Sequence, residues 1–245
     1  MQRTRILGSG FDPVTMTEAQ ARLGSYVTDG ESHLVITANP EMVMKARGDQ
    51  LLAEIMERAD LVVADGIGVV WASRMIGQAV PERIPGIELA EGLLQQAAKQ
   101  GWRVFLLGSE EGVAERAMQT LQDQLPDLEV VGTHHGFFKS GGEEDAVLAL
   151  IAEKKPDILL VALGVPRQEK WLAAHLGTLK VPLAIGVGGS INVWAGVDKR
   201  APLWIRRINL EWLYRLIRQP WRIKRLMALP VFVLAVMFSR FRQGR

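Results

Sequence analysis

Residues 157–168 read DILLVALGVPRQ, and this stretch decides the fold class. Its apolar run, Ile158–Leu163, does not alternate with polar residues, which is typical of a strand buried on both faces in a parallel sheet. Gly164 and Pro166 end the strand, and helical spacing begins at Pro166. A strand followed directly by a helix is the repeating unit of an α/β protein.

The same unit recurs along the chain. The expected strands are His33–Thr37, Leu61–Ala64, Trp102–Leu107, Leu128–Gly132, Asp157–Leu163 and Pro182–Val187. The expected helices are Thr15–Thr28, Glu41–Arg58, Ile67–Ile76, Ile87–Lys99, Gly112–Gln124, Glu143–Lys154 and Pro166–His175. The sequence therefore predicts an α/β fold, with a mostly parallel, Rossmann-like sheet flanked by helices.

Composition excludes several classes of protein. With 48% hydrophobic and 23% charged residues, the 245-residue chain has the balance of a packed globular protein. It has no cysteine, which excludes disulfides, thiolate nucleophiles and cysteine-ligated metals. The first fifteen residues carry no apolar run, so we expect no signal peptide.

The charge is unevenly distributed. Residues 199–245 contain twelve Lys or Arg against one acid, Glu211, a net +11, so residues 1–198 carry −9 of the formal total of +2. The partners of such a basic segment are phosphates, in nucleic acid or in lipid headgroups. We expect two parts: an α/β catalytic domain over residues 1–200 and a basic, membrane-associating appendage over residues 201–245.

The appendage has the pattern of an interfacial segment. A basic amphipathic helix is expected after Pro202, with its apolar stripe at Trp204, Ile205, Ile208, Trp212, Leu213, Leu216 and Ile217. The later run Leu226–Phe238 contains Pro230 and is shorter than the about twenty residues that cross a bilayer, so it fits a segment lying on one membrane face. The alternative is that the stripe packs on the body. Nucleic acid is the weaker partner, because no zinc-finger or RNP-like pattern accompanies the charge.

Glycines follow three of the expected strands. They are Gly108 with Ser109, Gly164, and Gly188 with Gly189. Glycine lets backbone N–H groups approach a phosphate at the carboxyl ends of parallel strands, so these exits predict a nucleotide pocket. Plain turn chemistry is the alternative, and Glu110 and Glu111 place negative charge after the first of them.

Several motifs together resemble the WecG/TagA/CpsF glycosyltransferases, which build cell-surface polymers on polyprenyl-diphosphate carriers. The matching blocks are Thr37–Glu41, Ala64–Gly66, Pro81–Gly86, Gly132–Phe138, Gly164–Trp171 and Gly186–Gly189, followed by Arg200–Pro202, Leu210–Leu216 and Arg222–Arg225. They cover nearly the whole chain in order. The resemblance implies an α/β fold distinct from the common GT-A and GT-B types, transfer with inversion, and an appendage that brings the enzyme to the membrane.

The resemblance also implies the substrates. A UDP-sugar is the expected donor, with N-acetylmannosamine first and glucose, galactose or a uronic acid as alternatives, and a polyprenyl-diphosphate-linked sugar is the expected acceptor. The expected location is the cytoplasmic face of the cell membrane, on an anionic surface, with a homo-oligomer possible and nucleic acid excluded. No Asp-x-Asp triplet occurs, so we expect neither a metal nor a cofactor.

The motifs assign roles to individual residues. Asp65 is the expected base, although an Asp before Gly66 also caps helices. Arg83 is expected to bind the diphosphate, while Thr37 and Asn39 match positions that line the same pocket. Asn39 before Pro40 is also a good helix cap.

The other expected contacts come from the glycine-bearing loops and the appendage. The substrate-binding set adds Gly108, Ser109, Gly164, Pro166, Gln168, Lys170, Gly188 and Gly189. Arg215, Arg222 and Arg225 are expected to bind the lipid diphosphate or general membrane phosphates.

Two functions of other classes compete. A dinucleotide-dependent oxidoreductase would need Gly-x-Gly-x-x-Gly after a strand, and none is found. A membrane-binding adaptor without catalysis would not need Asp65 and Arg83 at one shared site.

Overall fold

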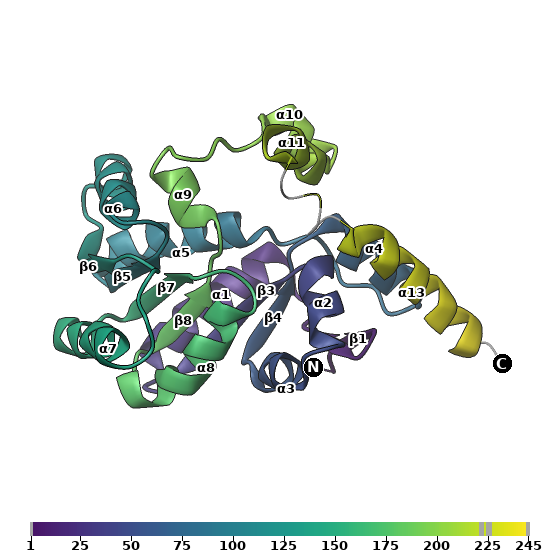
Figure 1. Ribbon diagram of the computed structural model, residues 1–245, viewed down its shortest axis with the longest axis horizontal. Helices are drawn as coiled ribbons and strands as arrows, with labels where there is room; N and C mark the ends of the chain where they lie inside the picture. Colours follow the sequence, from purple (N-terminus) through teal and green to yellow (C-terminus); the bar gives the residue numbers. More distant parts are fainter. Residues whose placement is uncertain (1, 221–222, 224–226, 244–245) are drawn as a thin grey trace.

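The computed structural model describes residues 2–220, 223 and 227–243. A six-stranded parallel sheet, in the order β4-β3-β8-β7-β5-β6, lies at its centre with helices on both faces (Figure 1). Its strands are β3 (His33–Ala38), β4 (Leu61–Ala64), β5 (Arg103–Gly108), β6 (Glu129–His134), β7 (Ile158–Ala162) and β8 (Leu183–Gly186). The predicted α/β class with a parallel sheet is confirmed.

In the described part of the chain, the helices of the body precede, connect or directly follow these strands, and α10, α11 and α13 come after them. They are α1 (Met16–Thr28), α2 (Pro40–Ala46), α3 (Gln50–Arg58), α4 (Ile67–Met75), α5 (Gly86–Gln100), α6 (Val113–Gln124), α7 (Gly142–Lys154), α8 (Arg167–Leu179), α9 (Ser190–Trp194), α10 (Leu203–Arg207), α11 (Glu211–Arg218) and α13 (Ala228–Gln243).

Strand β7 shows why both faces of the sheet are buried. Ile158 and Leu160 pack in the layer that contains α1, α5, α6 and α9, whereas Leu159 and Val161 pack in the layer with α2, α3, α7 and α8. All four side chains are fully buried. Burial on both faces explains the uninterrupted apolar run of the sequence.

The single helix predicted over Glu41–Arg58 is wrong. The structure has two helices there, because α2 stops at Ala46 and a new helix, α3, begins after Asp49. The Asp49 side chain accepts a hydrogen bond from the N–H of Leu52 at 3.1 Å and so caps the first turn of α3.

A two-stranded hairpin near the amino end was not predicted. Strands β1 (Thr4–Ile6) and β2 (Ser9–Phe11) are antiparallel and are joined at Leu7 and Gly8, whose φ angles of 49° and 92° are both left-handed. Each strand has three residues, which is too short to produce a readable periodicity.

The single amphipathic helix predicted after Pro202 is also wrong in its extent. Helices α10 and α11 are separate, and Asn209 between them has a φ of 60°, which no α-helix contains. The two lie together at the upper edge of the view in Figure 1, above the sheet. Their apolar side chains Trp204, Trp212 and Ile217 are exposed.

Helix α13 packs on the body beside α2 and α4 (Figure 1). Its side chains Phe232 and Val236 are completely buried, whereas Val231, Leu234 and Phe238 are exposed on its outer side. Pro230 does not break the helix, because it lies in the first turn, where a missing N–H costs nothing. Among the described helices none is long and apolar enough to cross a membrane.

We expect Phe232→Ala to release α13 from the body. The change removes a fully buried aromatic side chain, which costs about 3 kcal/mol of docking free energy. The measurement is hydrogen–deuterium exchange of the α13 amides, which should become much faster. Phe238→Ala on the same helix is the control, since Phe238 is 72% exposed. Unchanged exchange in Phe232→Ala would contradict this packing.

Candidate active site

The predicted site residues gather at one edge of the sheet. Because all six strands are parallel, their carboxyl ends lie on the same side, which we call the carboxyl edge. Asn39 follows β3, Asp65 follows β4, Ser109 follows β5, Gly164 follows β7, and Gly188 follows β8. Residues far apart in the chain are thereby brought to one edge.

Asp65 leaves the sheet between β4 and α4. Its N–H donates to the carbonyl of Ala38 at 2.9 Å, which extends the pairing of β3 with β4 by one residue, and its side chain is half-buried. The N-cap residue of α4 is Gly66, which has no side chain to cap the helix. The N-cap position of α4, which was the alternative role for Asp65, is therefore occupied by Gly66.

Thr37 lies on β3, which runs between β4 and β8, close to the carboxyl edge. Its hydroxyl donates to the carbonyl of Gly186 in β8 at 3.4 Å. Gly86, the first residue of α5, packs directly on it, since a Cβ on Gly86 would lie 2.8 Å from the Thr37 Oγ1. The N-terminus of the 15-residue helix α5 is thus held against the ends of β3 and β8.

Asn39 serves as a cap. Its Oδ1 accepts a hydrogen bond from the N–H of Met42 at 3.0 Å, which satisfies a donor in the first turn of α2. Asn39 therefore caps α2, as its place before Pro40 suggested. Its expected role in the substrate pocket stays a prediction.

The loop that carries Arg83 lies beside the end of β4, and the Arg83 side chain contacts the appendage. The N–H of Ile84 donates to the carbonyl of Ala64 at 2.9 Å, which holds this loop beside the end of β4. The Arg83 guanidinium donates to Asn209 Oδ1 at 3.3 Å and lies 3.7 Å from a Glu211 carboxylate oxygen. Two segments 126 residues apart in sequence thus meet at the carboxyl edge.

A network of ion pairs extends this contact. Arg200 pairs with Glu88 of α5, with Glu91 at 3.8 Å and with Glu211 at 3.7 Å. Arg206 of α10 also reaches Glu88, at 3.2 Å. These pairs join α10 and α11 to the first turns of α5.

The glycines of the other strand ends fall into two groups. Gly108 permits close packing of β5 on β7, because a Cβ there would lie 2.5 Å from the carbonyl oxygen of Ala162. Gly164, Gly188 and Gly189 face open space, since a Cβ on any of them would meet no atom of the described residues within 4 Å, apart from their own chain neighbours. The backbone at the ends of β7 and β8 is therefore accessible to a ligand.

Gln168 is buried beside this edge, with 3% of its surface exposed. Its amide lies under Gly186, where a Cβ would come within 2.5 Å of the Gln168 Nε2. That Nε2 donates to Oε1 of Glu169 at 2.7 Å, and the buried Oε1 of Gln168 has no hydrogen-bond partner among the residues that the structure describes.

Glu169 was not singled out from the sequence. It is 2% exposed, and burial raises the pKa of its carboxyl group from 4.5 to about 7. A glutamate in the first turn of a helix is usually solvated, so the local sequence gives no signal of this burial. In the sequence, the one hint of a role for Glu169 is that it directly follows Gln168 in the block Gly164–Trp171, which carries the family resemblance.

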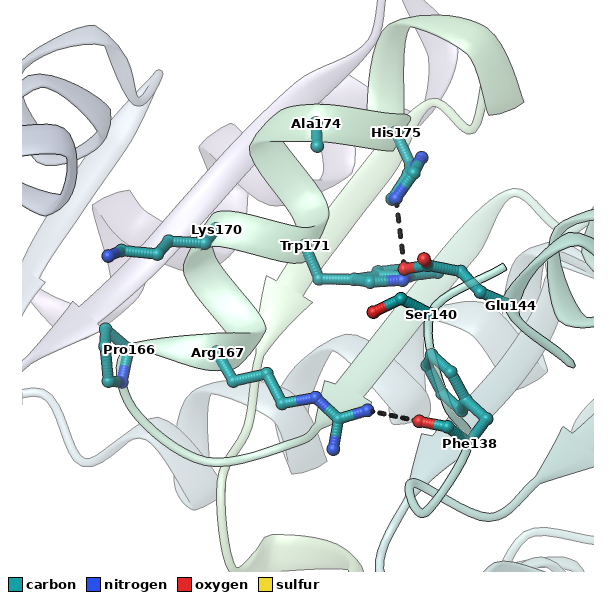
Figure 2. Close-up of a pocket in the computed structure, with 9 residues that line it drawn as sticks. All are labelled: Phe138, Ser140, Glu144, Pro166, Arg167, Lys170, Trp171, Ala174 and His175. Atoms are coloured by element: carbon teal, nitrogen blue, oxygen red, sulfur yellow. Dashed lines mark hydrogen bonds and ion pairs between the residues drawn. The ribbon is translucent and has the colours of Figure 1, made fainter. Parts of the chain in front are cut away.

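Lys170 lies on another side of α8. Its ammonium pairs with Asp49 at 2.6 Å and borders a groove of about 460 Å³. The groove is lined by Phe138, Ser140, Glu144, Pro166, Arg167, Lys170, Trp171, Ala174 and His175. Figure 2 shows Arg167 directed at the Phe138 carbonyl, 3.0 Å away, and His175 at Glu144, 3.4 Å away.

The groove holds Pro166 and Lys170 but neither Asp65 nor Arg83. We therefore locate the candidate site at the carboxyl edge of the sheet, which the Asp65 and Arg83 segments share with the open glycines that follow β7 and β8.

Three predicted arginines cannot be placed there. Arg222 and Arg225 lie outside the described residues, and of Arg215 only the backbone, in α11, is described. Over the described ranges, no three His, Asp or Glu side chains are grouped so that they could hold a metal ion.

We expect Glu169→Gln to change the pH dependence of stability. Between pH 4.5 and about 7 the unfolded chain loses the Glu169 proton while the folded protein keeps it, so wild-type stability falls as pH rises through this window. Relative to wild type, the free energy of unfolding of the variant should therefore rise by about 2–3 kcal/mol between pH 4 and pH 8. The measurement is urea unfolding at both pH values. Glu153→Gln, at an exposed position, is the control. If the free energies of unfolding of Glu169→Gln and wild type differed by the same amount at both pH values, the raised pKa of Glu169 would be contradicted.

Comparison with known proteins agrees with the sequence blocks. The profile of the glycosyl transferase WecG/TagA/CpsF family matches residues 4–245. An N-acetylglucosaminyldiphosphoundecaprenol N-acetyl-beta-D-mannosaminyltransferase of Staphylococcus aureus strain MW2 is 38% identical over 230 residues, covering 93% of this chain and 89% of the relative. The same enzyme of strain NCTC 8325 has the same identity and coverage. The chain belongs to the glycosyl transferase WecG/TagA/CpsF family.

Proposed function

We propose that this glycosyltransferase moves an N-acetylmannosamine-type sugar from a UDP-sugar to a polyprenyl-diphosphate-linked N-acetylglucosamine. The product would serve the synthesis of a cell-surface polysaccharide or teichoic acid. The proximity of the Asp65 and Arg83 segments at the carboxyl edge carries the proposal, because the reaction needs a base and a diphosphate-binding cation together. The name of the Staphylococcus aureus relatives supports this acceptor and this sugar.

Asp65 is the proposed base. Its carboxylate takes the proton from the attacking hydroxyl of the acceptor sugar as the new bond forms at the anomeric carbon of the donor. The bond to UDP breaks on the opposite side of that carbon, so the configuration is inverted. One carboxylate is sufficient for this single displacement.

Arg83 is proposed to stabilise the departing diphosphate. Negative charge grows on the UDP oxygens as the bond breaks, and a guanidinium with several N–H donors binds such oxygens well. The N-termini of α4 and α5 add favourable dipoles, and neither helix has a side-chain cap. Gly164, Gly188 and Gly189 would let the nucleotide approach the backbone, and Thr37, Asn39 and Gln168 would contact the donor.

The appendage, residues 201–245, is proposed to bring the body, residues 1–200, to the cytoplasmic face of the membrane. The exposed Trp204 and Trp212 on α10 and α11 support this, because indoles favour the headgroup region. Exposed Leu234 and Phe238 on α13 add apolar surface. The basic residues would bind anionic lipid and the acceptor diphosphate.

The donor sugar is the least constrained part of the proposal. Glucose, galactose or a uronic acid would need the same base and the same diphosphate contacts, and a few hydrogen bonds separate these sugars. A soluble oxidoreductase is disfavoured, because the chain lacks the Gly-x-Gly-x-x-Gly sequence.

We expect Asp65→Asn to abolish turnover while leaving UDP affinity nearly intact. The amide cannot accept the proton, which removes about 10²–10⁴-fold in rate. The assay uses a panel of UDP-sugars with a short-chain polyprenyl-diphosphate-linked N-acetylglucosamine, and calorimetry gives the affinity for UDP. Asp123→Asn, on the exposed side of α6, is the matched control. Retained turnover in Asp65→Asn would refute the base.

We expect turnover to survive chelation. The chain has no Asp-x-Asp triplet to bridge a divalent ion to the nucleotide, and the proposal assigns the diphosphate to arginine instead. The measurement is initial rate with and without EDTA. Loss of activity that Mn²⁺ restores would count against this mechanism.

A further inference from the structure

Glu169 is buried in a place where a carboxyl group costs stability. The residue is 2% exposed, and burial raises the pKa of its carboxyl group to about 7. An apolar side chain would occupy the same place without that cost. A buried acid in contact with a predicted substrate residue is typical of a functional site, and Glu169 contacts Gln168.

The Gln168 side chain occupies space that a glycine leaves open. A Cβ on Gly186, the last residue of β8, would lie 2.5 Å from Gln168 Nε2 and 3.0 Å from its Cδ, so any larger residue would push the amide away. The carbonyl oxygen of Gly186 accepts a hydrogen bond from the hydroxyl of Thr37 at 3.4 Å. Gly186 therefore links Gln168 to Thr37, another predicted substrate residue at the carboxyl edge.

Glu169 determines which end of the Gln168 amide remains available. Gln168 Nε2 donates to Glu169 Oε1 at 2.7 Å. A carboxyl group offers an acceptor oxygen whether or not it carries a proton, so the amide NH₂ group faces Glu169 in either state. The amide oxygen, Gln168 Oε1, is the end that is left for another group. It is buried and has no hydrogen-bond partner within the described ranges, although an unpaired buried acceptor costs free energy.

We propose that Glu169 is a positioning residue, which holds the Gln168 amide so that its oxygen accepts a hydrogen bond from the UDP-sugar. The inference rests on the proposed function through the contact of Gln168 with the donor. An acceptor oxygen selects a hydroxyl or an amide N–H, and it does not bond to phosphate oxygens, which are acceptors too. The group that Gln168 recognises therefore belongs to the uridine or to the sugar, because both carry such donors, and not to the diphosphate.

The test measures the dissociation constants of UDP and of UDP-N-acetylmannosamine by calorimetry. Glu169→Met removes the acceptor for Gln168 Nε2, so the amide is free to rotate. The UDP-sugar should bind about three- to tenfold more weakly, which is the effect of losing one neutral hydrogen bond. A loss that already appears with UDP places the contact on the uridine, and a loss with the UDP-sugar alone places it on the sugar. Unchanged affinity for both ligands would mean that Gln168 Oε1 serves only the protein interior, and would overturn the inference.

A double-mutant cycle distinguishes positioning from general damage. If Glu169 acts only through Gln168, Glu169→Met should cause no further loss of affinity in a chain that already carries Gln168→Met. A full additional loss in the double variant would show that Glu169 acts by another route, which would overturn the inference.

Glu144→Met is the matched control on the same helix. It removes an acid that pairs with His175 of α8 at 3.4 Å, in the groove that holds neither Asp65 nor Arg83, and it should leave both affinities unchanged. A loss equal to that of Glu169→Met would mean that any disturbance of α8 weakens binding, and would also count against the positioning role.

Gly186→Ala tests the same placement if Glu169→Met does not fold. The added Cβ displaces the Gln168 amide while Glu169 itself is unchanged. The same three- to tenfold loss, about one hydrogen bond, is expected, and unchanged affinity would contradict the inference.

Gln168→Met separates this inference from the proposed function. If wild type binds neither ligand, or if Gln168→Met binds both as tightly as wild type does, the proposed contact of Gln168 with the donor itself fails. If Gln168→Met weakens binding while Glu169→Met does not, only the positioning role of Glu169 fails.

Discussion

The common direction of the six strands is the constraint on which the site depends. Parallel pairing places the carboxyl end of every strand on one side, so Asp65, Thr37 and Gly188 all lie on that side although 151 residues separate the first and last of them along the chain. Parallel strands require helical crossovers, and these crossovers bury both faces of the sheet. The apolar strands, the helical layers and the gathering of polar loops at the carboxyl edge thus have one physical cause.

The appendage meets this edge by two different kinds of contact. Helices α10 and α11 are joined to α5 and to the Arg83 loop by ion pairs, whereas α13 is held against α2 and α4 by the buried Phe232 and Val236. Helices α2, α4 and α5 all begin at or near the ends of β3 and β4. The appendage therefore contacts the elements that surround Asp65, the residue proposed as the base.

The sequence alone predicted those features of the fold that local residue patterns determine. The buried runs gave the strands and their order of appearance, and the polar residues after them gave the edge. It did not reveal the break at Asp49, because two adjacent helices share the spacing of one long helix. The burial of Glu169 and the packing of Phe232 were also hidden, since both depend on which distant surfaces meet. The run that contains Phe232 fits a membrane face or a protein groove equally well, and only complementarity with α2 and α4 decides between them. The catalytic and binding roles of the individual residues remain predictions.

The chemical difference between the two attachments has a consequence for how they come apart. Dissolved salt screens ion pairs between partly exposed groups, but it does not weaken contacts between apolar side chains. Raising the ionic strength would therefore detach α10 and α11 while leaving α13 in place, so that the protein passes through a half-open form. If the appendage binds an anionic lipid surface as proposed, that surface would compete for the same arginines and favour that form without any change in the rest of the fold.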